Sequence, residues 1–377
     1  MRIAFWVRVG NKYGGLEKYI AAFAELCHQS GHDFLLINEI QNNSIEFRKR
    51  LSKVYVEQIV VGESLKSPFK VFSRTIKILI NWKPDVVQLH FINSLAVPLL
   101  RIVGVPLIYQ TYHSSIEHSI TLRTRFFRQL DNIFSTHVFG ISEHVCQDQI
   151  KAGVKPSKIK KIVLGLNPLD FLKNYNVLLE PKPPLWNNSN LIKIITIGRF
   201  FPIKGMRFVV EAAINVIKNH KDVIWWIVGK EGPDSHDCQK MIQDAGLAEK
   251  IIILGERNDV PALLNLCDFQ VVGSLSEGLP LMALEAAICG VPTVGTQVGG
   301  LCEAIVNGET GLLVEPSSST ELANATEWML DHPEQRKILG AAAKRYVMKN
   351  FNSEVEIKKL LHIFESDYES KVKHGKR

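Results

Sequence analysis

An alternation of short apolar runs with longer helical patterns constrains the fold of this chain more than any other feature. In the first half, strands are expected at 2–7, 34–37, 86–89, 107–110, 138–140 and 159–163, and helices at 16–29, 67–81, 122–134 and 143–151. Strands that alternate with helices favour a parallel sheet with helices on both faces. The first half therefore predicts a doubly wound α/β domain.

A second series of the same kind follows residues 165–190, which are rich in Pro and Asn and lack a sustained period, as is typical of a linker. Its strands are expected at 192–197, 223–228, 251–254, 269–272 and 292–295, and its helices at 204–219, 235–246, 280–289 and 319–330. The tail at 333–370 is helical in pattern and is interrupted at 350–353, where Asn352 or Ser353 can cap a last helix.

The length of 377 residues also favours two domains, because one hydrophobic core stops growing at roughly 250 to 300 residues. We predict an α/β architecture of two Rossmann-like doubly wound domains that face each other across a cleft. The first spans 1–170, a linker spans 171–190 and the second spans 191–350. Ligands of such sheets bind at the carboxyl ends of the strands, so the chemistry is expected at that cleft.

Several classes of protein are disfavoured by composition. No apolar run reaches the ~18 residues of a membrane span, and the first fifteen residues do not resemble a secretion signal, so a cytoplasmic location is expected. The six cysteines form no CxxC pair and lie mostly in apolar segments, which predicts reduced, structural thiols. The basic residues are not interleaved with aromatic residues in a groove-reading motif, which disfavours nucleic acid as a partner.

The net charge of +7 is unevenly divided along the chain. Residues 1–180 hold 23 Lys and Arg against 14 Asp and Glu, a balance of +9, whereas residues 181–377 hold 22 against 24, a balance of −2. Such asymmetry suggests an anionic partner for the first half, with solubilising surface charge as the alternative.

Two strand-to-helix turns have the composition of anion sites. Gly14 and Gly15 follow the first strand and precede a helix, so backbone N–H groups and the positive end of the helix dipole would point into the cleft. This signal is weak alone, and a tight turn is the alternative. In the second half, Arg199 and Lys204 flank the turn GRFFPIKG at 198–205. A guanidinium and an ammonium together suit a diphosphate in the absence of a metal.

A third segment, EGLPLMALE at 277–285, has one carboxylate in a loop and another on the helix that begins near Pro280. Eight helical residues would separate Glu277 and Glu285 by about 12 Å, more than the ~5 to 9.5 Å between the paired carboxylates of glycoside hydrolases. They are better placed to bind hydroxyl groups at the two ends of an extended ligand, such as a sugar nucleotide. The backbone N–H groups of the segment from Gly278 to Leu281, which includes Pro280, would face phosphates at the start of this helix.

His113 follows an apolar run in the first half and is predicted to hydrogen-bond a substrate hydroxyl. His90 occupies a similar strand end, and the sequence does not separate the two. A structural role is the alternative for both. The chain has no HExxH, clustered Asp/His or CxxC arrangement, so no catalytic metal or other cofactor is expected. The GxSxG nucleophile elbow is also missing.

Four segments together resemble the retaining glycosyltransferases of the GT-B fold, family 4: GGLEKY at 14–19, TYHSS at 111–115, GRFFPIKG at 198–205, and SEGLPLMALEAAICGVPTVGTQVGGLCEAI at 276–305. The resemblance covers nearly the whole chain. It implies transfer of a hexose from a nucleotide sugar, UDP-glucose foremost by analogy, to an acceptor hydroxyl with retention of anomeric configuration and without a metal. Polysaccharides, glycolipids and other glycoconjugates are the implied products.

The resemblance also implies roles for individual residues. Arg199 and Lys204 would bind the diphosphate and stabilise the leaving group, and the amide of Gly15 would contact phosphate from the first domain. Glu277, with the amides of Gly278 and Leu279, would hold the hydroxyls of the donor sugar. Glu285 would hold the ribose and His113 would contact the hexose. The backbone near Arg257, in GERNDVP at 255–261, would hold the base.

Two segments depart from the family pattern. Gly165-Leu166-Asn167-Pro168 stands where Asn-Gly-Val-Asp is common, so a linker contact to the donor is in doubt. VGKEGP at 228–233 replaces the commoner Gly-x-Gly-Pro, so that Lys230 or Glu231 is a further candidate for the nucleotide site.

In this family the first domain binds the acceptor, and the helix at 352–370 is expected to pack back on that domain. Two basic stretches of the domain are candidates for peripheral contact with an anionic membrane at the inner face of the cell membrane. One has Lys66, Lys70, Arg74 and Lys77 around the helix at 67–81, and the other has Arg123, Arg125 and Arg128 beside Phe126 and Phe127. The alternative is that the apolar face of the helix packs on its own sheet.

Two rival functions are compatible with the same tandem fold. A nucleotide-sugar epimerase or phosphorylase would not transfer the sugar to an alcohol acceptor. A non-catalytic binding protein would keep the fold but lose the cationic pair, which is present here as Arg199 and Lys204.

Overall fold

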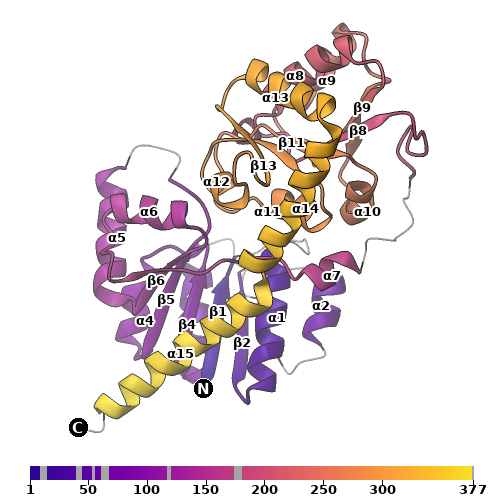
Figure 1. The fold of residues 1–377 in the computed structure, drawn as a ribbon. Helices are drawn as coiled ribbons and strands as arrows, with labels where there is room; N and C mark the ends of the chain where they lie inside the picture. The colour runs from indigo at the N-terminus through magenta and orange to yellow at the C-terminus, as the bar shows by residue number, and fades with distance from the viewer. Residues whose placement is uncertain are drawn as a thin grey trace. The chain divides into compact units, whose positions relative to one another are not determined.

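The computed structural model describes residues 1–8, 15–39, 45–52, 56–60, 68–116, 120–173 and 181–375. Contacts divide the chain into two compact units, Met1–Gly165 with Ser353–Arg377 and Leu166–Asn352 (Figure 1). The division falls before the predicted linker at 171–190, because the chain already contacts the second unit at Leu166, whose N–H donates to the carbonyl of Phe351 at 3.1 Å.

Among the described residues, the first unit contains one parallel sheet of seven strands in the order β3-β2-β1-β4-β5-β6-β7. The strands are β1 (Arg2–Val7), β2 (Asp33–Asn38), β3 (Val56–Val60), β4 (Val86–His90), β5 (Leu107–Tyr112), β6 (His137–Gly140) and β7 (Ile159–Lys161). The helices are α1 (Gly15–Gln29), α2 (Ile45–Leu51), α3 (Pro68–Trp82), α4 (Ala96–Ile102), α5 (Leu122–Phe134), α6 (Glu143–Lys151) and α15 (Ser353–Gly375).

Helices bury both faces of this sheet, as parallel strands require. On one face, Trp6 of β1 packs in a core with residues of α3 and α4. On the other face, the ring of Phe5 stacks on that of Phe23 of α1, with 4.8 Å between the ring centres. The ring centre of Phe364 of α15 lies 4.5 Å from that of Tyr109 of β5. Figure 1 shows α15, in yellow, lying across this unit although it is the last element of the chain.

The described part of the second unit contains a six-stranded parallel sheet in the order β10-β9-β8-β11-β12-β13. The strands are β8 (Ile192–Ile197), β9 (Val223–Val228), β10 (Ile251–Gly255), β11 (Phe269–Val272), β12 (Thr293–Thr296) and β13 (Gly311–Val314). The helices are α7 (Pro168–Leu172), the 3-10 turn η1 (Pro202–Lys204), α8 (Met206–Asn219), α9 (Ser235–Asp244), α10 (Val260–Asn265), α11 (Leu281–Ile288), α12 (Leu301–Ala304), α13 (Ser319–Asp331) and α14 (Pro333–Asn350).

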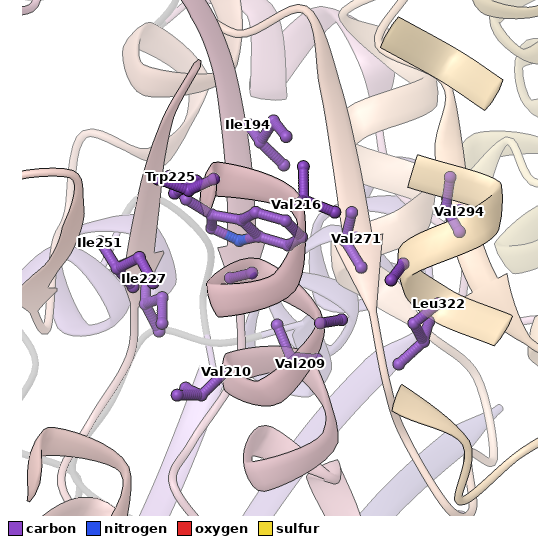
Figure 2. Packing of buried hydrophobic residues seen from close by; sticks show 14 of the residues in the cluster. Ile194, Val209, Val210, Val216, Trp225, Ile227, Ile251, Val271, Val294 and Leu322 are labelled. Carbon is purple, nitrogen blue, oxygen red and sulfur yellow. The ribbon is translucent and has the colours of Figure 1, made fainter. Parts of the chain in front are cut away.

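One face of the second sheet is closed by α8 and α13. Their apolar residues form a buried cluster with residues of the central strands, and Trp225 of β9 is among its fully buried members. Figure 2 shows the Trp225 indole lying among labelled aliphatic side chains from strands and helix. The indole N–H donates to Thr196 Oγ1 at 3.0 Å, so the polar atom of this side chain is satisfied within the core.

The α/β class and the two doubly wound sheets agree with the sequence prediction, and the main differences are short elements. The strands β3 and β13 and the helices α2, α4, α7, α10 and α12 were not predicted. They are too short to give a clear period. The helix expected at 204–219 begins at Met206, because Gly205 has a left-handed φ of 59° that ends η1.

The six cysteines are all free thiols. Cys27, Cys146 and Cys238 are buried, as expected for small structural side chains, whereas Cys302 is exposed. No helix in the described part of the chain is both long and apolar enough to cross a membrane.

Candidate functional site

The loops after β8 and β11 carry the residues predicted to bind a phosphate and a sugar. These two strands are neighbours in the second sheet although β9 and β10 separate them in sequence. They therefore form the point at which the strand order reverses, where open α/β sheets bind ligands at the carboxyl edge. Residues 198–205 follow β8, and residues 273–280 follow β11.

Lys204 and Glu277, one from each loop, meet in an ion pair. The Lys204 ammonium donates to Glu277 Oε1 at 2.6 Å, and the side chains are 19% and 7% exposed. The hydroxyl of Ser274 donates to the same oxygen at 2.7 Å. A buried carboxylate needs compensating donors, and these two hydrogen bonds supply them and fix the position of Glu277. The Lys204 ammonium has three N–H groups, so it can keep this bond and donate to a further anion.

Backbone hydrogen bonds brace the two loops against each other. The N–H of Leu275 donates to the carbonyl of Ile203 at 2.8 Å, and the N–H of Gly300 donates to the carbonyl of Glu277 at 2.8 Å. A Cβ on Gly205 would lie 1.9 Å from the carbonyl oxygen of Gly273. The close approach of the loops thus requires glycine at position 205, and it places Lys204 directly before the contact.

Arg199 is exposed on the same loop as Lys204, and its guanidinium lies 5.2 Å from the centre of the Phe201 ring. The ring limits the directions that the guanidinium can take, since cations and aromatic faces attract. The loop thus carries two cations, one held by Glu277 and one at the surface.

The helix α11 begins at Leu281, one residue later than predicted, and Pro280 is its N-cap residue and not its first helical residue. The amides of Gly278 and Leu279 take no part in the backbone hydrogen bonds found in the described part of the chain. Such N–H groups at a helix start are suited to an anion or a hydroxyl oxygen. Glu285 lies on α11 and is half-buried.

The Arg257 side chain is occupied within the protein. It donates to both carboxylate oxygens of Asp259, at 2.9 and 2.5 Å, and to the carbonyl of Pro181 at 2.7 Å. The sequence prediction for this position concerned the backbone, which these side-chain contacts do not involve. The predicted contact with a base remains a prediction.

The first unit carries the other predicted residues at the carboxyl edge of its own sheet. His113 follows β5, and its Nε2 lies 3.0 Å from Nδ1 of His90 at the end of β4. The His113 ring also stacks on Phe91 at 4.2 Å. Gly15 is the first residue of α1, whereas Gly14 lies outside the described residues. His90, which the sequence did not distinguish from His113, is fully buried and supports the His113 ring.

Burial keeps this histidine pair neutral. It lowers the pKa of His113 to about 3 and holds the pKa of His90 well below its ordinary value, with the neighbouring His113 adding to the effect on His90. In the unfolded chain both rings take up protons near pH 6.5. The contribution of the pair to stability is therefore complete above pH 6.5 and is lost as the pH falls toward 3.

We expect the free energy of unfolding to fall between pH 7 and pH 5, by at most about 2 kcal/mol for each group. The exchange His113→Asn removes one of the two titrating rings. Urea unfolding at both pH values should therefore give a smaller acid-induced loss in His113→Asn than in the unaltered protein. Equal losses in the two proteins would contradict the assignment of a neutral buried His113.

No group of three or more His, Cys, Asp or Glu side chains that could hold a metal ion occurs within the described ranges. The candidate site is thus made of the Lys204–Glu277 ion pair, a second cation, backbone amides and the half-buried carboxylate of Glu285.

Two family models match the chain and together span most of it. The model "Glycosyltransferase Family 4" matches residues 13–168, and the model "Glycosyl transferases group 1" matches residues 180–346. The second match contains every residue of the loops after β8 and β11. The chain belongs to the GT-B glycosyltransferases of family 4.

Curated relatives of this glycosyltransferase act on different sugars. It is 30% identical over 202 residues to N-acetyl-alpha-D-glucosaminyl L-malate synthase of Bacillus anthracis. That match covers 53% of this chain and 52% of the relative. It is 26% identical over 323 residues to UDP-Gal:alpha-D-GlcNAc-diphosphoundecaprenol alpha-1,3-galactosyltransferase of Escherichia coli, covering 82% of each chain. The match thus spans about half the length of the first relative and most of the second.

The solved structure of HepE from Anabaena in complex with UDP-glucose has the same fold, with a TM-score of 0.80. The two proteins are 20% identical, and the match covers 97% of this glycosyltransferase and 100% of HepE. At this identity the comparison establishes the GT-B architecture.

Proposed function

We propose that this glycosyltransferase moves a hexose from a UDP-sugar, with UDP-glucose as the first candidate, to an acceptor hydroxyl with retention of anomeric configuration and without a metal. The observation that carries the proposal is the Lys204–Glu277 pair at the reversal of strand order, with an ammonium and a carboxylate 2.6 Å apart. A donor that bears both negative phosphates and sugar hydroxyls fits these two groups at once. The HepE complexes with UDP and UDP-glucose and the UDP-galactose-using relative favour a uridine nucleotide.

In the proposed reaction, the bond between the anomeric carbon and the diphosphate oxygen breaks, and a bond from that carbon to the acceptor oxygen forms on the same face. Lys204 and Arg199 stabilise the charge that develops on the leaving diphosphate. Glu277 and the amides of Gly278 and Leu279 hold the hydroxyls of the hexose. The acceptor hydroxyl gives its proton to an oxygen of the departing diphosphate, so the products are a glycoside and UDP.

The experiment that tests this function is incubation of the purified protein with a panel of UDP-, GDP- and ADP-sugars, with and without EDTA. Mass spectrometry detects release of the nucleotide, and proton NMR of the anomeric signal reports the configuration of the product. We expect UDP release from a UDP-sugar that EDTA does not prevent, with an α-linked donor giving an α-linked product. Inversion, a strict need for a metal, or interconversion of nucleotide sugars without transfer would each contradict part of the proposal.

Glu285 on α11 is proposed to bind the ribose hydroxyls of the donor. Loss of a charged hydrogen bond weakens binding by about 1.5 to 3 kcal/mol, or roughly 10- to 100-fold. We therefore expect Glu285→Ala to weaken UDP binding by this factor in calorimetry, with a smaller effect on turnover at saturating donor. The matched control is Glu249→Ala, which removes an exposed carboxylate from the same unit. Unchanged UDP affinity in Glu285→Ala would exclude the assigned role.

A glycoconjugate with a lipid carrier is a fitting acceptor class. The membrane contact expected from the sequence needs correction, because Arg128 cannot take part in it. Arg128 does not lie at the surface, because its side chain is 11% exposed and donates to Tyr112 and Gln149. Most of the apolar residues of α3 pack against the first sheet. Lys70, Arg74 and Lys77 are exposed on the same helix as Ile80, which is 46% exposed. Lys66 lies outside the described residues.

The helix α5 has the two features of a membrane-binding surface, exposed apolar side chains and exposed cations. Leu122 and Phe126 are 86% and 56% exposed, and Arg123 and Arg125 beside them are exposed cations. We expect the protein to float with vesicles that contain anionic lipid at low salt, and Leu122→Ser/Phe126→Ser to reduce the bound fraction several-fold. Flotation that is equal in both proteins, or missing in both, would end this part of the proposal.

A further inference from the structure

A pocket in the first unit lies at the edge of the sheet opposite to His90 and His113. Its lining includes Leu107 at the start of β5, Thr136 directly before β6 and Lys158 directly before β7. These positions are the amino ends of the strands, whereas family ligands bind at the carboxyl ends. The pocket has a volume of about 390 Å³, within the range of small-ligand sites.

The charge of the pocket is strongly positive. Arg101, Lys158 and Lys371 line it, and Asp367 is the one carboxylate among the lining residues. Moreover, Asp367 is already engaged, since its Oδ2 accepts a hydrogen bond from the hydroxyl of Tyr109 at 2.8 Å and lies 3.5 Å from Nε2 of His137. Three cations thus face a single, shared negative charge.

Backbone carbonyls hold the three cations in place without using all of their N–H groups. Lys158 donates to the carbonyl of Ser135 at 2.6 Å, and Lys371 donates to the carbonyl of Pro106 at 2.5 Å. Each ammonium therefore has two further N–H groups. Arg101 donates to three carbonyls and to Thr136 Oγ1, which together occupy four of its five N–H groups.

The hydroxyl of Ser135 is a second, independent sign of a ligand. Ser135 lines the pocket and is only 1% exposed, and its Oγ has no hydrogen-bond partner among the described residues. A buried hydroxyl without a partner costs free energy that an acceptor oxygen of a ligand would recover. Burial and repulsion by Arg101 also lower the pKa of both Lys158 and Lys371, which an anion would reverse.

We propose that this pocket binds a phosphate group, separate from the donor site, between α15 and the amino ends of β5, β6 and β7. The ammonium and guanidinium N–H groups and the Ser135 hydroxyl supply donors to the phosphate oxygens, and Asp367 and Ser370 of α15 border it. The phosphate belongs either to a small soluble ester or to the headgroup of an anionic lipid. In both cases it links α15 to the sheet of the first unit.

Calorimetric titration of the full chain with inorganic phosphate and with glycerol 3-phosphate, at fixed ionic strength, tests the proposal. We expect Lys158→Met/Lys371→Met to weaken binding tenfold or more, and Ser135→Ala to weaken it to a smaller extent. Lys151→Met, which removes an exposed charge from α6, is the matched control and should bind as the unaltered protein does. Lys204→Met should retain this binding, because the donor site is a different place.

Flotation with vesicles of phosphatidylcholine and phosphatidylglycerol distinguishes the two sources of phosphate. Flotation that is lost in Lys158→Met/Lys371→Met but kept in Lys151→Met assigns the lipid headgroup, whereas soluble binding alone assigns the small ester. Because the lysine pair also holds backbone carbonyls, the rise in melting temperature on adding phosphate is measured for every variant. If the lysine variants bind like the unaltered protein, or if the unaltered protein binds neither phosphate nor vesicles, the proposal is wrong.

Discussion

Replacement of Lys204 by Met is expected to reduce turnover by about 10²- to 10³-fold, the usual cost of removing one donor that stabilises developing charge. The ammonium is the half-buried cation of the candidate site, 2.6 Å from Glu277. In the proposed reaction it meets the negative charge that grows on the diphosphate as the glycosidic bond breaks. The loss should thus appear in kcat more than in the KM for the donor.

Two companion variants separate this effect from damage to the fold. Lys204→Arg keeps the charge and should recover part of the activity, although the guanidinium is larger and directional. Lys218→Met removes an exposed lysine from the end of α8 in the same unit and should leave kcat unchanged. The Ser274 hydroxyl still donates to Glu277 in Lys204→Met, so the carboxylate is not left without a partner. A kcat within threefold of the unaltered enzyme would remove Lys204 from the mechanism.

The exchange Gly205→Ala is expected to have the largest effect on stability. Gly205 has a φ of 59°, which costs an L-residue about 1 kcal/mol, and a Cβ there would lie 1.9 Å from the Gly273 carbonyl oxygen. The loop after β8 would have to move away from the loop after β11, which separates Lys204 from Glu277. We expect a loss of about 3 kcal/mol or more in the free energy of unfolding, together with a loss of activity.

Gly246→Ala is the matched control for this prediction. Gly246 has a φ of 69°, but nothing lies within 4 Å of the Cβ that an alanine would add. Its substitution thus carries the conformational cost alone, about 1 kcal/mol. Thermal or urea unfolding gives the free energy of unfolding of both variants. The difference between them measures the cost of the overlap between the Cβ at position 205 and the Gly273 carbonyl oxygen. Equal destabilisation of the two would mean that the loops are not in close contact.

The sequence predicted the long elements and singled out the loops of the candidate site, because both depend on patterns within one segment. The strands at 192–197 and 223–228 were predicted with the bounds that the structure gives, since the first is rich in Ile and the second is a run of buried apolar residues. The segments with Lys204 and Glu277 were identified by residue type and position after a strand. The ion pair between them was not predicted, because it arises from the adjacency of β8 and β11 in the sheet.

Residues that support the site were harder to predict because their roles depend on neighbours far away in the sequence. Ser274 was missed, although a polar residue at a strand end three positions before Glu277 was a usable signal. The need for glycine at 205 depends on the Gly273 carbonyl, and the burial of Arg128 depends on Tyr112 and Gln149. Spacing on one helix placed Arg128 beside Arg125, but only packing decides which of them faces the protein.

Binding of UDP in EDTA, measured by calorimetry on the unaltered protein and on the Arg199→Ala/Lys204→Ala variant, tests the central claim most directly. The claim is that the loops after β8 and β11 bind the diphosphate of a nucleotide sugar without a metal. We predict micromolar binding of UDP to the unaltered protein and at least a 100-fold loss in the double variant. Equal affinities in the two proteins, or binding that appears only when a divalent metal is added, would contradict it.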